Sequence, residues 1–281
     1  MTPYFVYDVF TKEAFGGNQL AVIPDAIQIA EEDLQKIARE FNFSETTFIY
    51  PPEGTEHTAK VRIFTPTMEI PFAGHPLIGT ACALAQEGAS QNMVLELGVG
   101  PIICQSDGAS ASFGTTRPLE TLCDPDPALV AEALSISTSD LHLKVHPPVM
   151  ASLGLAFTIT EVKNREILSQ TAPDIAAIRK GNTRYPSGLD FAQFVYARLG
   201  NTLYARMFAP LDNIPEDPAT GSASATTAAL LAQIEGHDLD LTIRQGLEMG
   251  RPSEIAVSVR DNRITVAGHA RRVMQGNLLL N

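Results

Sequence analysis

The sequence predicts an α+β protein of two pseudo-symmetric lobes, each a curved, mostly antiparallel sheet wrapped around a buried central helix. Three observations lead to this prediction: many short strand-like runs, two helical segments that are apolar on nearly all sides, and an internal repeat that contains both. The chain has 281 residues, with 20 Gly and 19 Pro, which is typical of a turn-rich protein with many short strands. At roughly 150 residues per domain, this length fits about two domains.

Apolar runs of strand length recur along the whole chain. They are Tyr4–Val9, Thr46–Tyr50, Lys60–Phe64, Met93–Leu97, Ile102–Gln105, Leu155–Thr160, Gln193–Arg198, Leu203–Phe208, Leu239–Arg244, Glu254–Val259 and Ile264–Ala267. Amphipathic spacing predicts a helix over Glu31–Phe41. Pro76–Gln86 and Ser222–Gln233 carry apolar or small residues on nearly every side, which indicates two fully buried helices.

The internal repeat joins the segments that contain these two helices. At a spacing of 144 residues, Arg62, Phe64, Pro66, Ile70 and Pro71 match Arg206, Phe208, Pro210, Ile214 and Pro215. At a spacing of 147 residues, Gly74, Leu84, Ala85 and Gln86 match Gly221, Leu231, Ala232 and Gln233. The change of spacing predicts a three-residue insertion just before the second helix.

The repeat also predicts where the chain divides. We expect an N-terminal lobe at residues 1–125 and a C-terminal lobe at residues 126–281, with the C-terminal strand 270–281 a candidate for addition to the first lobe. Both buried helices follow a Gly-containing turn and have no charged side chain in their first turn, which leaves their partially positive ends available. Across a cleft between pseudo-symmetric lobes, these ends would hold a carboxylate or another small anion. Local capping, for example by Ser222, is the alternative.

Composition excludes several classes of partner. Lys and Arg number 20 against 32 Asp and Glu, and the resulting net charge of −12 argues against binding of nucleic acid or anionic lipid. No apolar run approaches the roughly 18 residues that span a membrane, and Met1–Asp8 does not resemble a signal peptide. The odd set Cys82, Cys104 and Cys123 has no metal-type spacing and fits free thiols in a reducing cytoplasm. We therefore expect a cytoplasmic protein without nucleic-acid or membrane partners.

A few polar residues lie near the two helix starts, and each also has a purely structural explanation. Asp217 precedes the second helix and either caps it or acts as an acid or base. His75 follows Gly74 at the first helix start, where the dipole disfavours protonation and a neutral ring suits proton transfer or a structural hydrogen bond. Glu45 lies between a helix and a strand, where acidic residues are usually solvated. Asn18 lies in a Gly turn and fits plain turn chemistry.

No metal, nucleotide or flavin motif occurs in the sequence. His142 and His146 are four residues apart, but Leu141–Val145 predicts a strand that ends at Pro147. On one face of a strand, the two rings would lie about 13 Å apart, too far to share a metal. We therefore expect neither a metal nor a cofactor.

Short motifs surround the candidate residues: FGGNQLAV at 15–22, SETTF at 44–48, RIFTP at 62–66, GHP at 74–76 and EDPATGS at 216–222. Together with Gln245–Gly246, they resemble the family of phenazine-biosynthesis protein F (PhzF), a branch of the diaminopimelate epimerase fold. The similarity extends from the first strand to about Gln275. The resemblance implies the two-lobe architecture, a homodimer, and proton-transfer chemistry without a cofactor in the cleft between the lobes.

The resemblance also implies roles for individual residues. It implies that Glu45 is the catalytic base and that His75 and Asp217 complete the catalytic set. It implies substrate binding by Asn18, Ser44, Gly74, Gly221, Ser222 and Gln245. Epimerases of this fold use two cysteines, whose positions the resemblance places at Ala73 and Asp217, so a two-thiol racemisation is excluded.

We therefore expect a cofactor-independent isomerase that moves a proton on a small cyclic or unsaturated carboxylic acid. Partial desolvation should raise the pKa of Glu45, and the helix starts should stabilise charge that develops as the proton leaves. Two alternatives stay open at this point. One is an epimerase or racemase that uses Glu45 and Asp217 as its acid–base pair, and the other is a non-catalytic small-anion binding protein.

Overall fold

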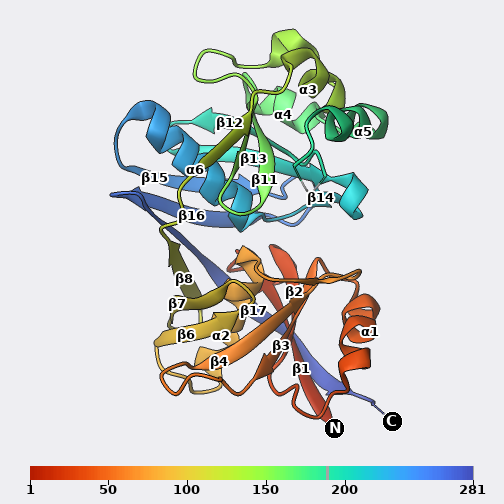
Figure 1. Cartoon of the computed structure of the whole chain (residues 1–281), viewed down its shortest axis with the longest axis vertical. Helices are drawn as coiled ribbons and strands as arrows, with labels where there is room; N and C mark the ends of the chain where they lie inside the picture. The colour runs from red at the N-terminus through yellow and green to blue at the C-terminus, as the bar shows by residue number, and fades with distance from the viewer. Residues whose placement is uncertain (188–189, 281) are drawn as a thin grey trace. The chain divides into compact units, whose positions relative to one another are not determined.

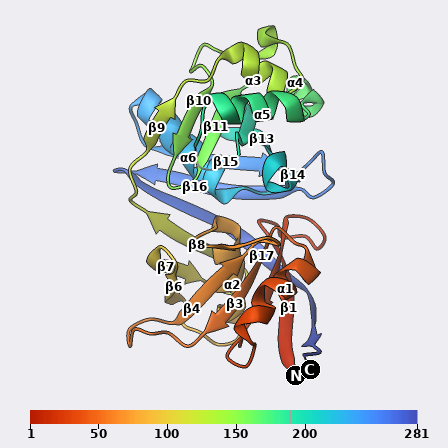
Figure 2. The ribbon, with the colours of Figure 1, turned by 45° about the vertical axis from the view of Figure 1, so that its right-hand side comes forward.

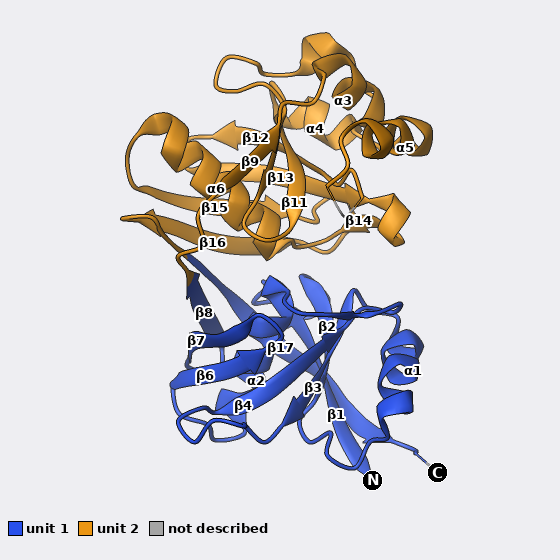
Figure 3. Cartoon of the chain, in the orientation of Figure 1, with its two compact units in different colours: residues 1–114, 265–281 blue, residues 115–264 orange. Residues whose placement is uncertain are grey.

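The computed structural model describes residues 1–187 and 190–280 and divides the chain into two compact units (Figure 3). Unit 1 comprises Met1–Gly114 and Thr265–Asn281, and unit 2 comprises Thr115–Ile264. The boundary precedes the predicted one at residue 125, because strand β9 (Glu120–Cys123) pairs with a strand of unit 2. The C-terminal segment belongs to unit 1. The sequence analysis had considered adding residues 270–281 to the first lobe.

Unit 1 is made mainly of strands. These are β1 (Thr2–Val9), β2 (Asn18–Ile23), β3 (Glu45–Tyr50), β4 (Ala59–Phe64), β5 (Glu69–Ile70), β6 (Asn92–Leu97), β7 (Gly100–Ser106), β8 (Ser110–Thr115) and most of β17 (Arg263–Leu278). Its helices are α1 (Glu31–Phe41), which has the predicted bounds, and α2 (Gly74–Gln86).

The strands of unit 1 close into a barrel around α2. Their pairing runs β1–β2–β3–β4–β6–β7–β8–β17 and returns from β17 to β1. The pairs β2–β3 and β4–β6 are parallel. Every residue from Gly74 to Ala83 is buried, as expected for a helix without a polar face. Figures 1 and 2 show α2 among these strands, with α1 on the outside.

Unit 2 has the same plan with additional helices. Its strands are β9, β10 (Val149–Ser152), β11 (Ala156–Glu161), β12 (Gln193–Leu199), β13 (Thr202–Ala209), β14 (Ile214–Asp217), β15 (Leu239–Gln245) and β16 (Ser253–Arg260). Its helices are α3 (Pro127–Ala133), α4 (Arg165–Gln170), α5 (Ile175–Arg184) and the buried α6 (Gly221–Glu235), with 3₁₀ turns η1 (Thr138–Asp140) and η2 (Pro210–Asp212). In the described part of the chain, no helix is both long and apolar enough to span a membrane.

The sequence analysis missed the short helices α3, α4 and α5. Each has a side-chain cap: Asp126, Asn164 and Asp174 accept backbone N–H groups of the first turn. Residues of all three helices, such as Leu129 and Ile178, contribute to one apolar cluster with strand residues of unit 2. The capping residues could have been recognised in the sequence. The helices themselves are too short to show a clear helical period of apolar residues.

The predicted strand Leu141–Val145 is wrong. Leu141 makes a single bridge to Val162, and the residues after it turn. His142 Nδ1 lies 3.1 Å from Glu161 Oε1, and His146 Nε2 lies 2.8 Å from the Tyr196 hydroxyl. A turning segment can direct both rings to these inner partners. Among the described residues, no group of three or more His, Cys, Asp or Glu is arranged to hold a metal.

The strand pairings confirm the internal repeat. In unit 1, β2 is parallel to β3, β3 is antiparallel to β4, and β4 is parallel to β6. In unit 2, β11, β12, β13 and β15 follow each other with the same directions. In both units, a short strand and then the buried helix separate the last two strands of this series.

The insertion in the repeat lies earlier than predicted. Ile63 of β4 pairs with Ile70 of β5, and its repeat partner Met207 of β13 pairs with Asp217 of β14. Ile70 is therefore matched by Asp217, 147 residues later. The additional residues lie in the connection between β13 and β14, where η2 forms, rather than directly before α6.

An arginine–glutamate pair recurs at equivalent positions in the two units. Arg62 donates to both carboxylate oxygens of Glu69 at 2.8 and 2.6 Å, and Arg206 donates to both of Glu216 at 2.8 and 2.7 Å. The two pairs differ in burial. The side chains of Arg206 and Glu216 are 10% and 17% exposed, against 21% and 44% for Arg62 and Glu69. Each pair ties a short strand to the longer strand beside it, β5 to β4 and β14 to β13.

We predict that Arg206→Ala destabilises the protein much more than Arg62→Ala. Removing Arg206 leaves the Glu216 carboxylate buried without its partner, which costs about 3–5 kcal/mol. Removing Arg62 leaves a more solvated Glu69 and should cost roughly 1 kcal/mol or less. Urea unfolding followed by circular dichroism measures both free energies of unfolding, and equal losses would contradict the assignment.

Candidate functional site

Three of the predicted site residues come together in unit 1. Asn18 opens β2, Glu45 opens β3, and His75 is the second residue of α2. His75 Nδ1 lies 3.3 Å from Glu45 Oε2 and 3.4 Å from Asn18 Nδ2. Asn18 and His75 are buried, and the Glu45 side chain is only 13% exposed. We call these three residues the Glu45 cluster.

The parallel pairing of β2 with β3 explains why Asn18 and Glu45 meet. Parallel strands start at the same edge of a sheet, and Glu45 pairs with Leu20, two residues beyond Asn18. Gly17 turns the chain into β2 at φ +62°, and a Cβ at Gly17 would lie 2.2 Å from the Val9 carbonyl oxygen. Only glycine therefore fits the turn that delivers Asn18.

The sequence analysis missed Asp8, which supports the same turn. Asp8 is buried in β1, and its Oδ2 accepts the backbone N–H of Phe15 at 2.6 Å. An acidic residue within the apolar run Tyr4–Val9 was the available signal. Ser44 lies half-buried directly before Glu45, in the connection from α1 to β3.

The His75 ring is neutral at physiological pH. Burial lowers the pKa of His75 to about 3, and a hydrogen bond with the backbone of Gln19 opposes this shift only in part. The sequence analysis expected a neutral ring because of the helix dipole, whereas burial is the main cause here. The buried Nε2 atom makes no hydrogen bond within the described residues. A neutral imidazole beside a carboxylate is suited to move one proton in either direction.

We predict that His75 stays unprotonated throughout the pH range 5–8. Its pKa of about 3 lies below the ordinary histidine value of 6.5, so the unfolded state takes up a proton first as the pH falls. The His75 contribution to stability is therefore complete above about pH 6.5 and declines towards pH 3. Imidazole NMR signals recorded against pH test this, with His75→Gln identifying the resonance. Titration of that signal near pH 6 to 7 would contradict the prediction.

In unit 2, Asp217 is held by two neighbouring residues. Thr220 Oγ1 donates to Asp217 Oδ2 at 2.5 Å. Gln245 Nε2 donates to the Asp217 carbonyl oxygen at 2.7 Å and to Thr220 Oγ1 at 2.9 Å, and Gln245 Oε1 accepts the Thr220 N–H at 3.1 Å. All three side chains are buried. We call these residues the Asp217 turn, because they fix the connection from β14 to α6.

Gln245, predicted as a substrate contact, supports the Asp217 turn in this structure. Its side chain is fully buried, and both the oxygen and the nitrogen of its amide make hydrogen bonds within the turn. The following Gly246 has φ +74°, and a Cβ there would lie 2.7 Å from the Pro218 carbonyl oxygen. The Gln245–Gly246 motif therefore supports the Asp217 turn by packing against its backbone.

Both buried helices begin without a side-chain cap. The N-cap residues are Ala73 for α2 and Thr220 for α6, and neither first turn contains an acidic residue. The first N–H groups of a helix have no partner within the helix, so both ends can attract an anion. Ser222 is half-buried in the first turn of α6 and is not its cap. Gly74 and Gly221 open the two helices.

The register of the repeat corrects one correspondence that the resemblance implied. Ala73 is equivalent to Thr220, because both are N-caps 147 residues apart, whereas Asp217 is equivalent to Ile70. Neither helix start carries a thiol. Cys82 and Cys104 are buried elsewhere in unit 1, and burial raises the pKa of their thiols to about 11 and about 12. These thiols are therefore protonated and unsuited to act as bases.

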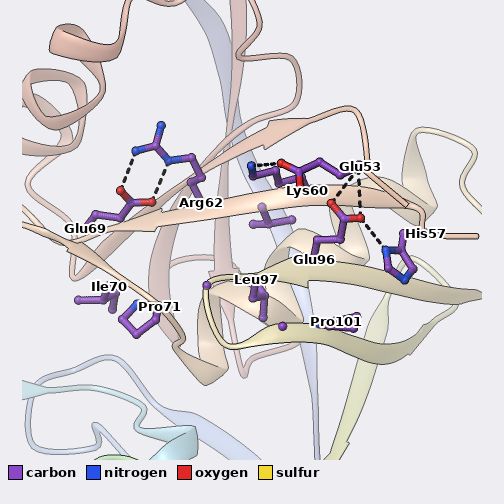
Figure 4. Close-up of a pocket in the computed structure, with 13 residues that line it drawn as sticks. Glu53, His57, Lys60, Arg62, Glu69, Ile70, Pro71, Glu96, Leu97 and Pro101 are labelled. Carbon is purple, nitrogen blue, oxygen red and sulfur yellow. Dashed lines mark hydrogen bonds and ion pairs between the residues drawn. The ribbon is translucent and has the colours of Figure 1, made fainter. Parts of the chain in front are cut away.

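A groove of about 730 Å³ in unit 1 contains none of the predicted site residues (Figure 4). Its charged side chains are paired: Lys60 with Glu53, Arg62 with Glu69, and His57 with Glu96. Hydrogen bonds lower the pKa of Glu96 to about 2. The largest effect comes from the backbone N–H of Glu53, followed by the His57 ring and the backbone N–H of Gly54. The ionic groups of this groove thus stabilise the surface of the barrel.

Comparison with known proteins identifies relatives along nearly the whole chain. Residues 7–276 match the sequence model of a family described as phenazine biosynthesis-like protein. An uncharacterized isomerase from Mesorhizobium japonicum is 36% identical, over 99% of this chain and 98% of its own. The trans-2,3-dihydro-3-hydroxyanthranilate isomerase of Pseudomonas aeruginosa is 32% identical over the full length of both chains. A PhzF family crystal structure from Bacillus anthracis superposes with a TM-score of 0.88 at 25% identity, covering 99% of each chain.

Proposed function

Because the chain belongs to the phenazine biosynthesis-like (PhzF) family, whose relatives include named isomerases, we propose that it catalyses a cofactor-independent proton shift on a small cyclic or unsaturated carboxylic acid. The observation that supports this most directly is the contact of Glu45 with the buried, neutral His75. A carboxylate and a neutral imidazole side by side can take a proton from one atom and return it to another. No group in this scheme needs a metal or a redox cofactor.

In the proposed reaction, Glu45 removes a proton from a carbon of the substrate. Delocalisation into the substrate's double bonds and carboxylate stabilises the negative charge, and the uncapped start of α2 beside the cluster stabilises it further. Glu45 or His75 then returns the proton at another position of the same molecule. The bond that breaks and the bond that forms are both C–H bonds, so the product is an isomer.

We propose that Asp217 is the second acid–base group and acts on the same substrate. Its support is the turn that holds it: a buried carboxylate fixed by Thr220 immediately before an uncapped helix. Substrate contacts by Ser44, Asn18, Gly74, Gly221 and Ser222 belong to the same proposal. They place the carboxylate of the substrate at the helix starts.

Glu45→Gln should strongly reduce proton transfer while substrate binding persists. The test is deuterium uptake from heavy water, read by mass spectrometry, with 2,3-dihydro-3-hydroxyanthranilate as first compound and a panel of cyclic and unsaturated acids. Loss of one acid–base group should lower turnover about 10²- to 10⁴-fold. Glu40→Gln, the same change on the exposed side of α1, is the matched control and should leave turnover unaltered. Unchanged uptake by Glu45→Gln would exclude Glu45 as the base.

An epimerase is the second candidate, since the buried acidic residues Glu45 and Asp217 could serve as a pair of bases. The same experiment separates the two reactions. An isomerase gives a product with a moved double bond, whereas an epimerase gives deuterium at an inverted stereocentre of the unchanged skeleton. A ligand recovered without deuterium from every incubation would instead favour a binding protein.

We also propose a cytoplasmic homodimer. The three cysteines are free, which suits a reducing compartment. Val99, directly before β7, is 46% exposed, and Ile103, within β7, is 61% exposed. Exposed apolar side chains of this kind are candidates for burial against a second copy of the chain. Light scattering should give twice the chain mass of 30.2 kDa, and a monomer at micromolar concentration would contradict the dimer.

A further inference from the structure

We infer that Thr220 is a positioning residue for Asp217: its hydroxyl proton is directed to Asp217 Oδ2, so that Oδ1 is the oxygen that exchanges a proton with the substrate. This inference rests on the proposed function and names a residue and an atom within it. It is carried by the four hydrogen bonds of the Asp217 turn.

The first step fixes the orientation of the Gln245 amide. The backbone N–H of Thr220 can only donate, so the Gln245 atom that it meets at 3.1 Å must be the oxygen. The Asp217 carbonyl oxygen can only accept, so the Gln245 atom 2.7 Å away must be the nitrogen. The two contacts therefore require the same orientation of the Gln245 amide, and exchanging its oxygen and nitrogen would lose both hydrogen bonds.

The second step fixes the direction of the Thr220 hydroxyl. With its orientation set, Gln245 Nε2 donates to Thr220 Oγ1 at 2.9 Å. Thr220 Oγ1 has one proton of its own, and the remaining partner is Asp217 Oδ2 at 2.5 Å. The chain of donors thus runs from Gln245 through Thr220 to Asp217. Because Oδ2 accepts this proton, a proton that Asp217 itself carries belongs on Oδ1.

Capping of α6 does not explain the place of the Thr220 hydroxyl. Thr220 is the N-cap of α6, but its side chain makes no capping hydrogen bond. The backbone of Thr220 already serves the turn, because its carbonyl oxygen accepts the Ser224 hydroxyl at 2.8 Å. Valine keeps the shape and this backbone. It removes the donor to Asp217 and one acceptor of Gln245 Nε2, which keeps its bond to the Asp217 carbonyl oxygen.

The neighbouring charges have partners of their own. Arg206 pairs with Glu216 beside β14, and Arg244 pairs with Glu254 beside Gln245. The first turn of α6 contains no acidic residue. Arg251, in the connection after Gly246, is half-buried and makes a further interaction, as does Asp217 itself. The Thr220 hydroxyl is the neutral donor to Asp217 Oδ2.

The test compares Thr220→Val with Thr220→Ser and Thr227→Val in the full-length protein. Thr227 lies on the same helix, is fully buried, and its hydroxyl has no hydrogen bond within the described residues, so Thr227→Val is the matched control. A hydrogen-bond donor to a carboxylate favours its ionised form. We call the part of the pH–activity profile that reports ionisation of Asp217 its pH limb, and Thr220→Val should move the midpoint of this limb to a higher pH by about one unit. Deuterium uptake should fall about 10- to 100-fold in kcat with a smaller change in KM.

Thr220→Ser should restore both the pH limb and kcat, whereas Thr227→Val should leave both unaltered. Wild-type kinetics and melting temperature in Thr220→Val would overturn the inference, as would a loss that serine does not restore. If Thr220→Val does not fold, Thr220→Ala carries the same expectation for the pH limb. If the wild type takes up no deuterium from any compound, the proposed function fails. If the wild type exchanges and Thr220→Val matches Thr227→Val, only the role of Thr220 fails.

Discussion

Helices α2 and α6 have no polar face, so both must be buried along most of their length. A helix that is apolar on all sides must be covered on all sides, and in each unit the strands wrap around it to do so. A charged side chain that capped such a buried helix end would be costly to desolvate. The starts of α2 and α6 accordingly consist of small residues together with Pro76 and the neutral His75, and their free backbone N–H groups become the available polar surface.

The repeated scaffold carries a site that is not repeated. Glu45 occupies the start of β3, and the strand registers place Ala192, a buried residue, at the equivalent position before β12. The counterpart of His75 is Ser222, and the counterpart of Asp217 is Ile70. The two units have therefore kept the same helix starts and strand directions while their ionisable groups moved to different positions. Unlike groups suit a proton shift between two atoms of one molecule, whereas a symmetric pair suits inversion at one carbon.

Burial sets the chemistry of both clusters. In unit 1, it keeps His75 neutral beside Glu45. In unit 2, it makes each hydrogen bond of the Asp217 turn expensive to lose, because a buried polar atom without a partner costs about 1–3 kcal/mol. That cost is why a single amide, Gln245, can fix the rotation of a hydroxyl and through it the orientation of a carboxylate.

Apolar periodicity and repeated residues are local properties of the chain, and they were enough to predict the fold class, the bounds of α1, the two buried helices and the repeat. The motifs that contain Glu45, His75 and Asp217 made these residues candidates. The position of the insertion between β13 and β14, the support that Gln245 gives the Asp217 turn and the contact of Thr220 with the Asp217 carboxylate became visible only in the folded chain. The partners in these contacts come together only after the strands have paired, and no local pattern records which atoms then meet.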